Sequence, residues 1–288
     1  MITKRFIKFL KEQAKEDAEK YATFWETFGL YIKEGVTTDF EYREELGELL
    51  RFQSSKSEGD AMVSLRDYVD RMKEGQDKIY YINGPSREAL EAGPYVEMFS
   101  KKDIEILFTL EPIDDFVLNH LGEFDGKKLV SADRSDLELP EAAEEDNKEE
   151  AAEQGQDLGG DEAASLCSWM KEVLGDRVGE IALSHRLVSS PAMIVNADGY
   201  LTSSMERVLQ ASAQEEHLAM SSKKNLEINA ASPLIKRLAS LRETRQDFAR
   251  DVVEQIYDNA MIQAGLVVNS QKMVQRNYRI LEHLAGEE

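Results

Sequence analysis

Apolar residues near the start of the chain recur every three or four positions, which is the spacing of one face of an α-helix. The stripe runs through Phe6, Leu10, Ala14, Ala18, Tyr21, Trp25 and Phe28. It predicts one long amphipathic helix that ends near Gly35, followed by a second helix at about 42–50. The pattern is at full strength from Met1 with no N-cap residue before it, so we expect the chain to be part of a longer one.

Short β-type runs alternate with helical stretches between 76 and 130. Runs of β-branched, aromatic and aliphatic residues at 79–82, 104–108 and 127–130 predict three strands. A helical stretch ends near Phe99, and another starts at Pro112, whose ring suits the first position of a helix. This strand–helix–strand order predicts a small parallel sheet covered by helices.

The pattern after 162 is mixed. It predicts a helix at 163–174, an amphipathic helix at 201–209, and strands within 177–184, 193–195 and 226–229. From Pro233 to Leu284 it is almost entirely helical, with a break at Gly265 that predicts a helical hairpin. The predicted fold is therefore of the α/β (α+β) class, with a helical segment, a small parallel αβα sandwich, and a mixed α/β C-terminal domain.

The two helices of the hairpin each carry an apolar stripe. The stripes contain Val253, Ile256, Ala260 and Ala264 on the first helix, and Val274, Tyr278, Leu281 and Leu284 on the second. Such a hairpin needs a partner surface. Pattern alone leaves two alternatives: the hairpin packs on its own domain, or two copies form a four-helix bundle across a two-fold axis.

The charge of the chain is large and unevenly placed. The 288 residues include 35 basic and 56 acidic side chains, for a formal net charge of −21. Between Ser131 and Ala163 there are 13 acids against two bases. Such a segment buries too little apolar surface to offset its ordering entropy, although a solvated charged helix is an alternative. We predict an acidic linker at 131–162 between a first domain at 1–130 (helical 1–75, αβα 76–130) and a second at 163–288.

Composition excludes several classes of protein and site. No apolar run approaches the 18 residues of a membrane span, and the N-terminus lacks the features of a secretory signal. The single cysteine, Cys167, excludes a disulfide framework and a cysteine-based zinc site. The negative charge argues against binding nucleic acid or anionic lipid. A reducing cytoplasm is the simplest location.

Catalytic chemistry is not apparent from the motifs. The chain has no GxSxG or HExxH sequence, and no Walker-type lysine follows its glycines. Asp114 and Asp115 lie at a predicted helix start, where the macrodipole favours negative charge. Site chemistry alone therefore indicates no enzyme.

Several segments, in order, resemble the ninety-kilodalton heat-shock chaperone family. They include Phe24-Trp25-Glu26-Thr27-Phe28-Gly29, Leu50-Arg51-Phe52, Lys78-Ile79-Tyr80-Tyr81-Ile82, Ser100-Lys101-Lys102-Asp103-Ile104-Glu105, Glu123-Phe124-Asp125-Gly126-Lys127, Ser184-His185-Arg186-Leu187 and Leu226-Glu227-Ile228-Asn229. The resemblance covers nearly the whole chain except the acidic linker, and it implies the late part of the family's middle domain followed by its C-terminal dimerisation domain.

The resemblance also implies what each part does. ATP, Mg²⁺ and the arginine that reaches the γ-phosphate belong to segments that would precede Met1, so we expect no cofactor and no ATPase activity in this chain. The chain ends without the Met-Glu-Glu-Val-Asp tail that docks helical-repeat co-chaperones, so a bacterial cytoplasmic member is implied ahead of an organellar one.

Client contacts in bacterial members carry over to two helices. The predicted client-binding residues are Asp115, Phe116 and Asn119, with Leu201, Met205, Val208 and Leu209. The family pattern has tryptophan where Phe116 stands and an aromatic where Leu209 stands. It also has glutamate at 115 and methionine at 201. The dimer interface is predicted at Val253, Ile256, Ala260, Val274, Tyr278 and Leu281.

The sequence therefore predicts a homodimeric chaperone fragment that binds non-native client proteins. Two alternatives remain: a passive dimerisation module with no client affinity of its own, and a small α/β enzyme built on the strands at 79–130.

Overall fold

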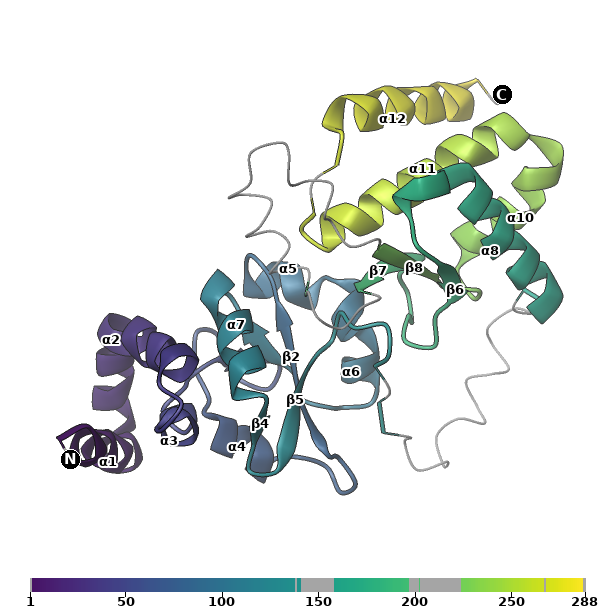
Figure 1. The fold of residues 1–288 in the computed structure, drawn as a ribbon. Coiled ribbons are helices and arrows are strands. Elements are labelled where there is room, and N and C mark those ends of the chain that lie inside the picture. Colours follow the sequence, from purple (N-terminus) through teal and green to yellow (C-terminus); the bar gives the residue numbers. More distant parts are fainter. Residues whose placement is uncertain are drawn as a thin grey trace. The chain divides into compact units, whose positions relative to one another are not determined.

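The computed structural model describes residues 2–137, 139–140, 158–196, 202, 224–266 and 268–286 (Figure 1). Contacts within the chain divide it into two compact units. Unit 1 comprises Met1–Ala92 and Phe99–Ala132, and unit 2 comprises Gly93–Met98 and Asp133–Glu288.

Unit 1 begins with two helices where the sequence pattern predicted one. They are α1 (Ile2–Glu16) and α2 (Ala18–Thr38). The break is at Asp17, whose carboxylate accepts a hydrogen bond of 3.0 Å from the backbone N–H of Lys20 and caps α2. The prediction of one continuous helix was wrong because periodicity registers the shared apolar face and not a cap inside it.

Gly35 does not end α2, contrary to the prediction, because the helix continues to Thr38. The glycine instead allows the close packing of α3 (Arg43–Gly47): a Cβ at position 35 would lie 2.9 Å from Cδ1 of Leu46. Helix α4 (Leu65–Asp70) follows, with Ser64 and Asp67 forming a capping box at its start.

A five-stranded sheet with the order β1-β3-β2-β5-β4 completes unit 1. Its central strands are parallel, as predicted: β3 (Leu107–Thr109), β2 (Lys78–Asn83) and β5 (Lys127–Ser131). Antiparallel edge strands β1 (Gln53–Ser54) and β4 (Glu123–Phe124) were not predicted, because two residues carry no alternation to detect.

Alternate residues of β2 face different layers, as the period of a strand requires. Ile79 and Tyr81 join the main core together with residues of α7 (Pro112–Leu121). Tyr80 points to the other layer, where its ring lies 5.1 Å from that of Phe99. After β2 the chain continues through α5 (Arg87–Glu91), the 3₁₀ turn Pro94–Val96 and α6 (Glu97–Lys101).

One apolar core joins the helical segment of unit 1 to its sheet. It contains buried residues of α1, α2, α3 and α4, of β2 and β3, and of α7. Because this core is continuous, the position of α7 is set by α2 and α3 as well as by the sheet that it covers.

Unit 2 contains a three-stranded sheet with the order β6-β8-β7. β6 (Ile181–Leu183) runs parallel to β8 (Lys224–Ile228), and β7 (Ala192–Asn196) runs antiparallel to it. Helix α8 (Gly160–Leu174) precedes the sheet and leads into the 3₁₀ turn Gly175–Arg177.

Three helices end the chain: α10 (Pro233–Thr244), α11 (Gln246–Gln263) and α12 (Ser270–Ala285). α11 lies at the centre of unit 2 and packs on β7, α8, α10 and α12. Residues 133–137 of the predicted linker also belong to this unit, since Asp133 and Ser135 exchange backbone hydrogen bonds with Asn196. The acidic residues at 141–157 lie outside the described part of the chain.

Candidate functional site

Helix α7 carries the first set of predicted client contacts. It starts at Pro112 with a capping box, in which the side chains of Glu111 and Asp114 accept hydrogen bonds from each other's backbone N–H groups. It ends at Gly122, whose φ of 71° only glycine adopts without strain. The local sequence therefore specifies both ends of the helix.

The three predicted contact residues of α7 do not share one environment. Phe116 is half-buried and Asn119 is exposed, so both reach the surface. Asp115 is fully buried. The expectation that all three contact a client therefore differs from the structure at Asp115, because its neighbours Val117 and Leu118 turn that side of α7 into the core.

A buried ion pair fixes α7 against α2. The Nζ of Lys33 lies 2.7 Å from Oδ1 of Asp114 and 2.9 Å from Oε2 of Glu111. The Lys33 and Asp114 side chains are only 6% and 4% exposed. Burial raises the pKa of Asp114 and Lys33 opposes that rise. Removing Lys33 would leave the buried charge of Asp114 without its cation.

The loop between α11 and α12 has the signals of two helix ends. Gly265 has a φ of 72°, and the N–H of Leu266 donates to the carbonyl of Met261 at 2.9 Å. Asn269 then caps α12 by accepting a hydrogen bond from the N–H of Lys272 at 3.0 Å. The predicted break at Gly265 is confirmed, and these two caps explain it.

The six residues predicted for the dimer interface fall into two groups. Val253, Ile256 and Ala260 of α11 are buried within unit 2, at 0%, 4% and 2% exposure. Val274, Tyr278 and Leu281 of α12 are exposed, at 49%, 63% and 57%. The stripe of α11 is therefore used inside its own unit, whereas the stripe of α12 faces outward.

Polar contacts hold α12 on α11. Arg276, 2% exposed, is the buried residue of α12. Its guanidinium donates to Glu254 at 2.8 Å, to Gln255 at 3.2 Å and, in a short contact, to Asp258. Because residues two positions apart face nearly opposite sides of a helix, anchoring at 276 directs the Val274–Tyr278–Leu281 stripe away from α11. We call these three residues the α12 stripe.

The sequence pattern did not reveal Arg276 or Lys33 as key residues. Both are long basic side chains, which composition assigns to the surface. A signal was present for Arg276, since Glu254 and Asp258 are four residues apart and share one side of the preceding helix.

The second set of predicted client residues, Leu201, Met205, Val208 and Leu209, lies outside the described residues. The chain on either side of that segment is anchored by buried polar contacts. The Nζ of Lys224 donates to Oδ1 of Asn196, whose amide donates to Asp133 at 2.7 Å. The described ends that flank that segment, Asn196 and Lys224, are therefore paired with each other on the neighbouring strands β7 and β8.

The described residues offer neither a cluster of metal ligands nor a reactive thiol. They contain no group of three or more His, Cys, Asp or Glu side chains placed to hold a metal ion. Cys167 is buried, and burial raises the pKa of its thiol, which disfavours the reactive thiolate. Within the same residues, no helix is long and apolar enough to span a membrane.

Comparison with known proteins identifies the family. The model of the family described as Hsp90 protein matches residues 1–287. The chain is 60% identical over 284 residues to the chaperone protein HtpG of Desulfotalea psychrophila, which covers 98% of this chain and 45% of that protein. It is 44% identical over 282 residues to HtpG of Desulfitobacterium hafniense, covering 98% and 44%.

A mitochondrial relative also matches. The heat shock protein 75 kDa of Bos taurus is 38% identical over 283 residues, with 98% of this chain and 40% of that protein covered. The chain thus spans less than half the length of each of these relatives. Together with the match of the family model, these identities show that the chain belongs to the Hsp90 family of chaperones and is of the bacterial HtpG type.

Proposed function

We propose that this chain is the dimerising, client-binding part of a cytoplasmic molecular chaperone. The α12 stripe is the observation that supports the proposal most strongly. Three large side chains, two of them more than half exposed, lie in one row on a helix that ion pairs hold in place. Exposed apolar rows of this kind mark interaction surfaces.

A second copy of the chain is the proposed occupant of the α12 stripe. Two antiparallel copies of α12 would bring each Tyr278 and Leu281 against their counterparts around a two-fold axis. Burying a large apolar side chain contributes about 1.5–3 kcal/mol, and each dimer would bury four such side chains from these two positions. In this arrangement Val253, Ile256 and Ala260 support the interface from inside α11.

Sedimentation velocity at micromolar concentration tests the dimer. We expect the wild-type chain to sediment as a dimer, and the variant Tyr278→Ala plus Leu281→Ala as a monomer. The matched control, Gln275→Ala plus Glu282→Ala, changes two exposed residues of α12 that lie beside the stripe, and it should remain dimeric. A dimeric stripe variant, or a monomeric control, would refute the proposed contact.

Client binding is proposed at the exposed part of α7. Phe116 offers a half-buried aromatic face beside the amide of Asn119, and the buried pair of Lys33 and Asp114 holds this surface rigid. Asp115 then acts from within the core and not as a contact. Leu201, Met205, Val208 and Leu209 remain a sequence-based proposal for the second client surface.

Binding of a reduced, unfolded model protein tests the client surface. We expect Phe116→Ala plus Met205→Ala to weaken binding several-fold. The control is Phe40→Ala, which removes a more exposed aromatic, 80% accessible, from the same unit. If the control weakens binding equally, any exposed aromatic side chain contributes to client binding, and the proposed client surface on α7 is refuted.

The two rival functions are separated by simple measurements. A passive dimerisation module would not suppress the heat aggregation of a test protein, whereas the proposed chaperone part should do so in light scattering. A nucleotide-dependent enzyme would bind ATP. We expect no heat of binding with ATP in isothermal titration, since the proposal places ATP and Mg²⁺ on a part of the protein outside this chain.

A further inference from the structure

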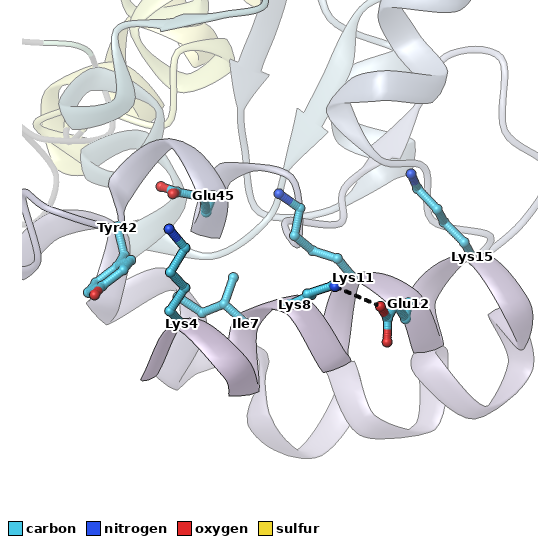
Figure 2. A pocket seen from close by; sticks show the side chains of 8 residues that line it. All are labelled: Lys4, Ile7, Lys8, Lys11, Glu12, Lys15, Tyr42 and Glu45. Carbon is cyan, nitrogen blue, oxygen red and sulfur yellow. Dashed lines mark ion pairs between the residues drawn. The ribbon is translucent and has the colours of Figure 1, made fainter. Parts of the chain in front are cut away.

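A groove on unit 1 is lined by basic side chains in a chain that is otherwise strongly acidic. It has a volume of about 330 Å³ and runs along α1 (Figure 2). Its lining residues are Lys4, Ile7, Lys8, Lys11, Glu12 and Lys15 of α1, with Tyr42 and Glu45 at α3. None of these residues belongs to the predicted client or dimer surfaces.

The four lysines form a row because of their spacing. Positions 4, 8, 11 and 15 are four, three and four residues apart, so they share one side of α1. At 1.5 Å per residue, the row from Lys4 to Lys15 is about 16 Å long. Ile7 and Leu10 of the same helix are buried in the core, which fixes the direction in which the row faces.

The local charge is opposite to that of the whole chain. α1 has five basic and two acidic side chains, for a net charge of +3, whereas the chain carries −21. An acidic partner would be repelled by most of this protein's surface and attracted along this row. The row therefore sets both the place and the orientation of such a partner.

Two lysines at the ends of the row remain available. Lys11 pairs with Glu48 at 2.6 Å, and Lys8 lies 3.8 Å from Glu12, as the dashed line in Figure 2 shows. Among the described residues, no carboxylate lies within ion-pairing distance of Lys4 or Lys15. The groove thus presents two uncompensated positive charges at its ends, with two partly neutralised ones between them.

We propose that this groove binds an acidic α-helix of a partner protein, whose carboxylates recur at the same four-three-four spacing. Opposed helices with this register bring one carboxylate to each lysine, while the partner's apolar side chains contact the partly exposed ring of Tyr42. A nucleic acid or an anionic membrane is a less suitable occupant, because its phosphates extend beyond this short row of lysines and would be repelled by a chain whose net charge is −21.

Glu45 adds a specificity element. It lies on the α3 side of the groove and carries the wrong charge for an acidic ligand. A partner with a basic residue opposite position 45 would therefore bind more tightly than a wholly acidic one. Conversely, Glu45→Gln should improve binding of a wholly acidic helix by about twofold, the value of one exposed charge contact.

The test uses a labelled, alanine-rich helical peptide with glutamates at relative positions 1, 5, 8 and 12, and the full chain at low salt. We expect fluorescence anisotropy to show binding that weakens as salt rises. A peptide of the same composition, with its glutamates spread around the helix, should bind more weakly. Lys4→Glu plus Lys15→Glu should weaken the spaced peptide about tenfold, since each exposed pair contributes a factor of about two to five. Both side chains are exposed, and the Lys11–Glu48 pair is left intact.

The control variant is Arg5→Glu plus Lys20→Glu, which changes the net charge equally at exposed positions that do not line the groove. It should lower affinity by less than twofold. Mass spectrometry of lysine acetylation locates the binding site of the peptide on the chain. We expect the bound peptide to protect Lys4 and Lys15 from acetylation. Equal losses in the control, equal binding of the permuted peptide, or protection by polyphosphate or anionic vesicles but not by the peptide would each overturn the proposal.

Discussion

Replacing Arg276 tests how the α12 stripe is presented. Its guanidinium is almost fully buried and contacts Glu254, Gln255 and Asp258 of α11. Arg276→Ala would leave the carboxylate of Asp258, whose side chain is 11% exposed, without its cation. Removing one partner of a buried pair costs about 3–5 kcal/mol. The stability lost in Arg276→Ala cannot exceed the free energy with which α12 docks on α11, because α12 can detach while the rest of unit 2 stays folded.

The matched control is Arg279→Ala on the same pair of helices. Arg279 pairs with Asp251 through two contacts, at 2.9 and 2.5 Å, but its side chain is 54% exposed. An exposed pair contributes about 0–1 kcal/mol. The two substitutions therefore remove similar chemistry and differ in burial, so their effects should differ by about 2–5 kcal/mol.

Hydrogen exchange of the α12 amides is the decisive assay, with urea unfolding beside it. In Arg276→Ala the α12 amides should exchange at least about thirtyfold faster than in Arg279→Ala, which corresponds to about 2 kcal/mol of lost docking free energy. Dimer formation should weaken in parallel, because the stripe is no longer held in one orientation. If both variants protect α12 equally, Arg276 does not anchor the helix and the account of the stripe is wrong.

Two further predictions concern buried or partly buried charges in the two units. The carboxylate of Glu97 accepts hydrogen bonds from the N–H groups of residues 188–190; burial alone would raise its pKa, but these bonds and the Ser190 hydroxyl lower it below 4.5. The contribution of ionised Glu97 to stability is therefore present above pH 4.5 and is lost as the pH falls through the lowered pKa. In urea unfolding, Glu97→Gln should be about 1–2 kcal/mol less stable than the wild type at pH 7, and this difference should narrow below pH 4.5. A difference that stays constant with pH would contradict the assignment. Lys33→Met should destabilise unit 1 by about 3 kcal/mol at pH 7. The pKa of Asp114 is already raised by burial, and it should rise further without Lys33. The Lys33→Met variant should therefore become more stable as the pH falls, which is the opposite of the effect of Glu97. The double variant Lys33→Met plus Asp114→Asn should not show this gain of stability at low pH.

Much of the fold could be predicted from local pattern. The three parallel strands, the helix that starts at Pro112 and the hairpin with its break at Gly265 are each specified by residues close together in the chain. The errors have local causes as well. Asp17 interrupts one periodic stripe with a cap, and Gly35 lies inside a helix because Leu46, eleven residues later, needs the space.

The candidate sites divide in the same way. Periodicity identified the residues on the hairpin stripes, but it could not tell that Val253, Ile256 and Ala260 are covered by their own unit while Tyr278 and Leu281 are not. An apolar stripe has the same sequence signature whichever surface covers it. Likewise, the pattern gave the position of Asp115 on α7 but not its burial, which depends on how α2 and the sheet enclose the helix.

The sequence by itself determined the central parallel strands, the helix that starts at Pro112, the hairpin break at Gly265 and the resemblance to one chaperone family, because these properties depend on residues a few positions apart. Only the tertiary structure decided that Arg276 and Lys33 are buried, that the α12 stripe faces outward, and that four lysines of α1 line a groove with α3. The ion pairs join residues from 18 (Arg276 and Asp258) to 81 (Lys33 and Asp114, 114 − 33) positions apart in the sequence. A side chain's chemistry does not specify which distant surface it will meet.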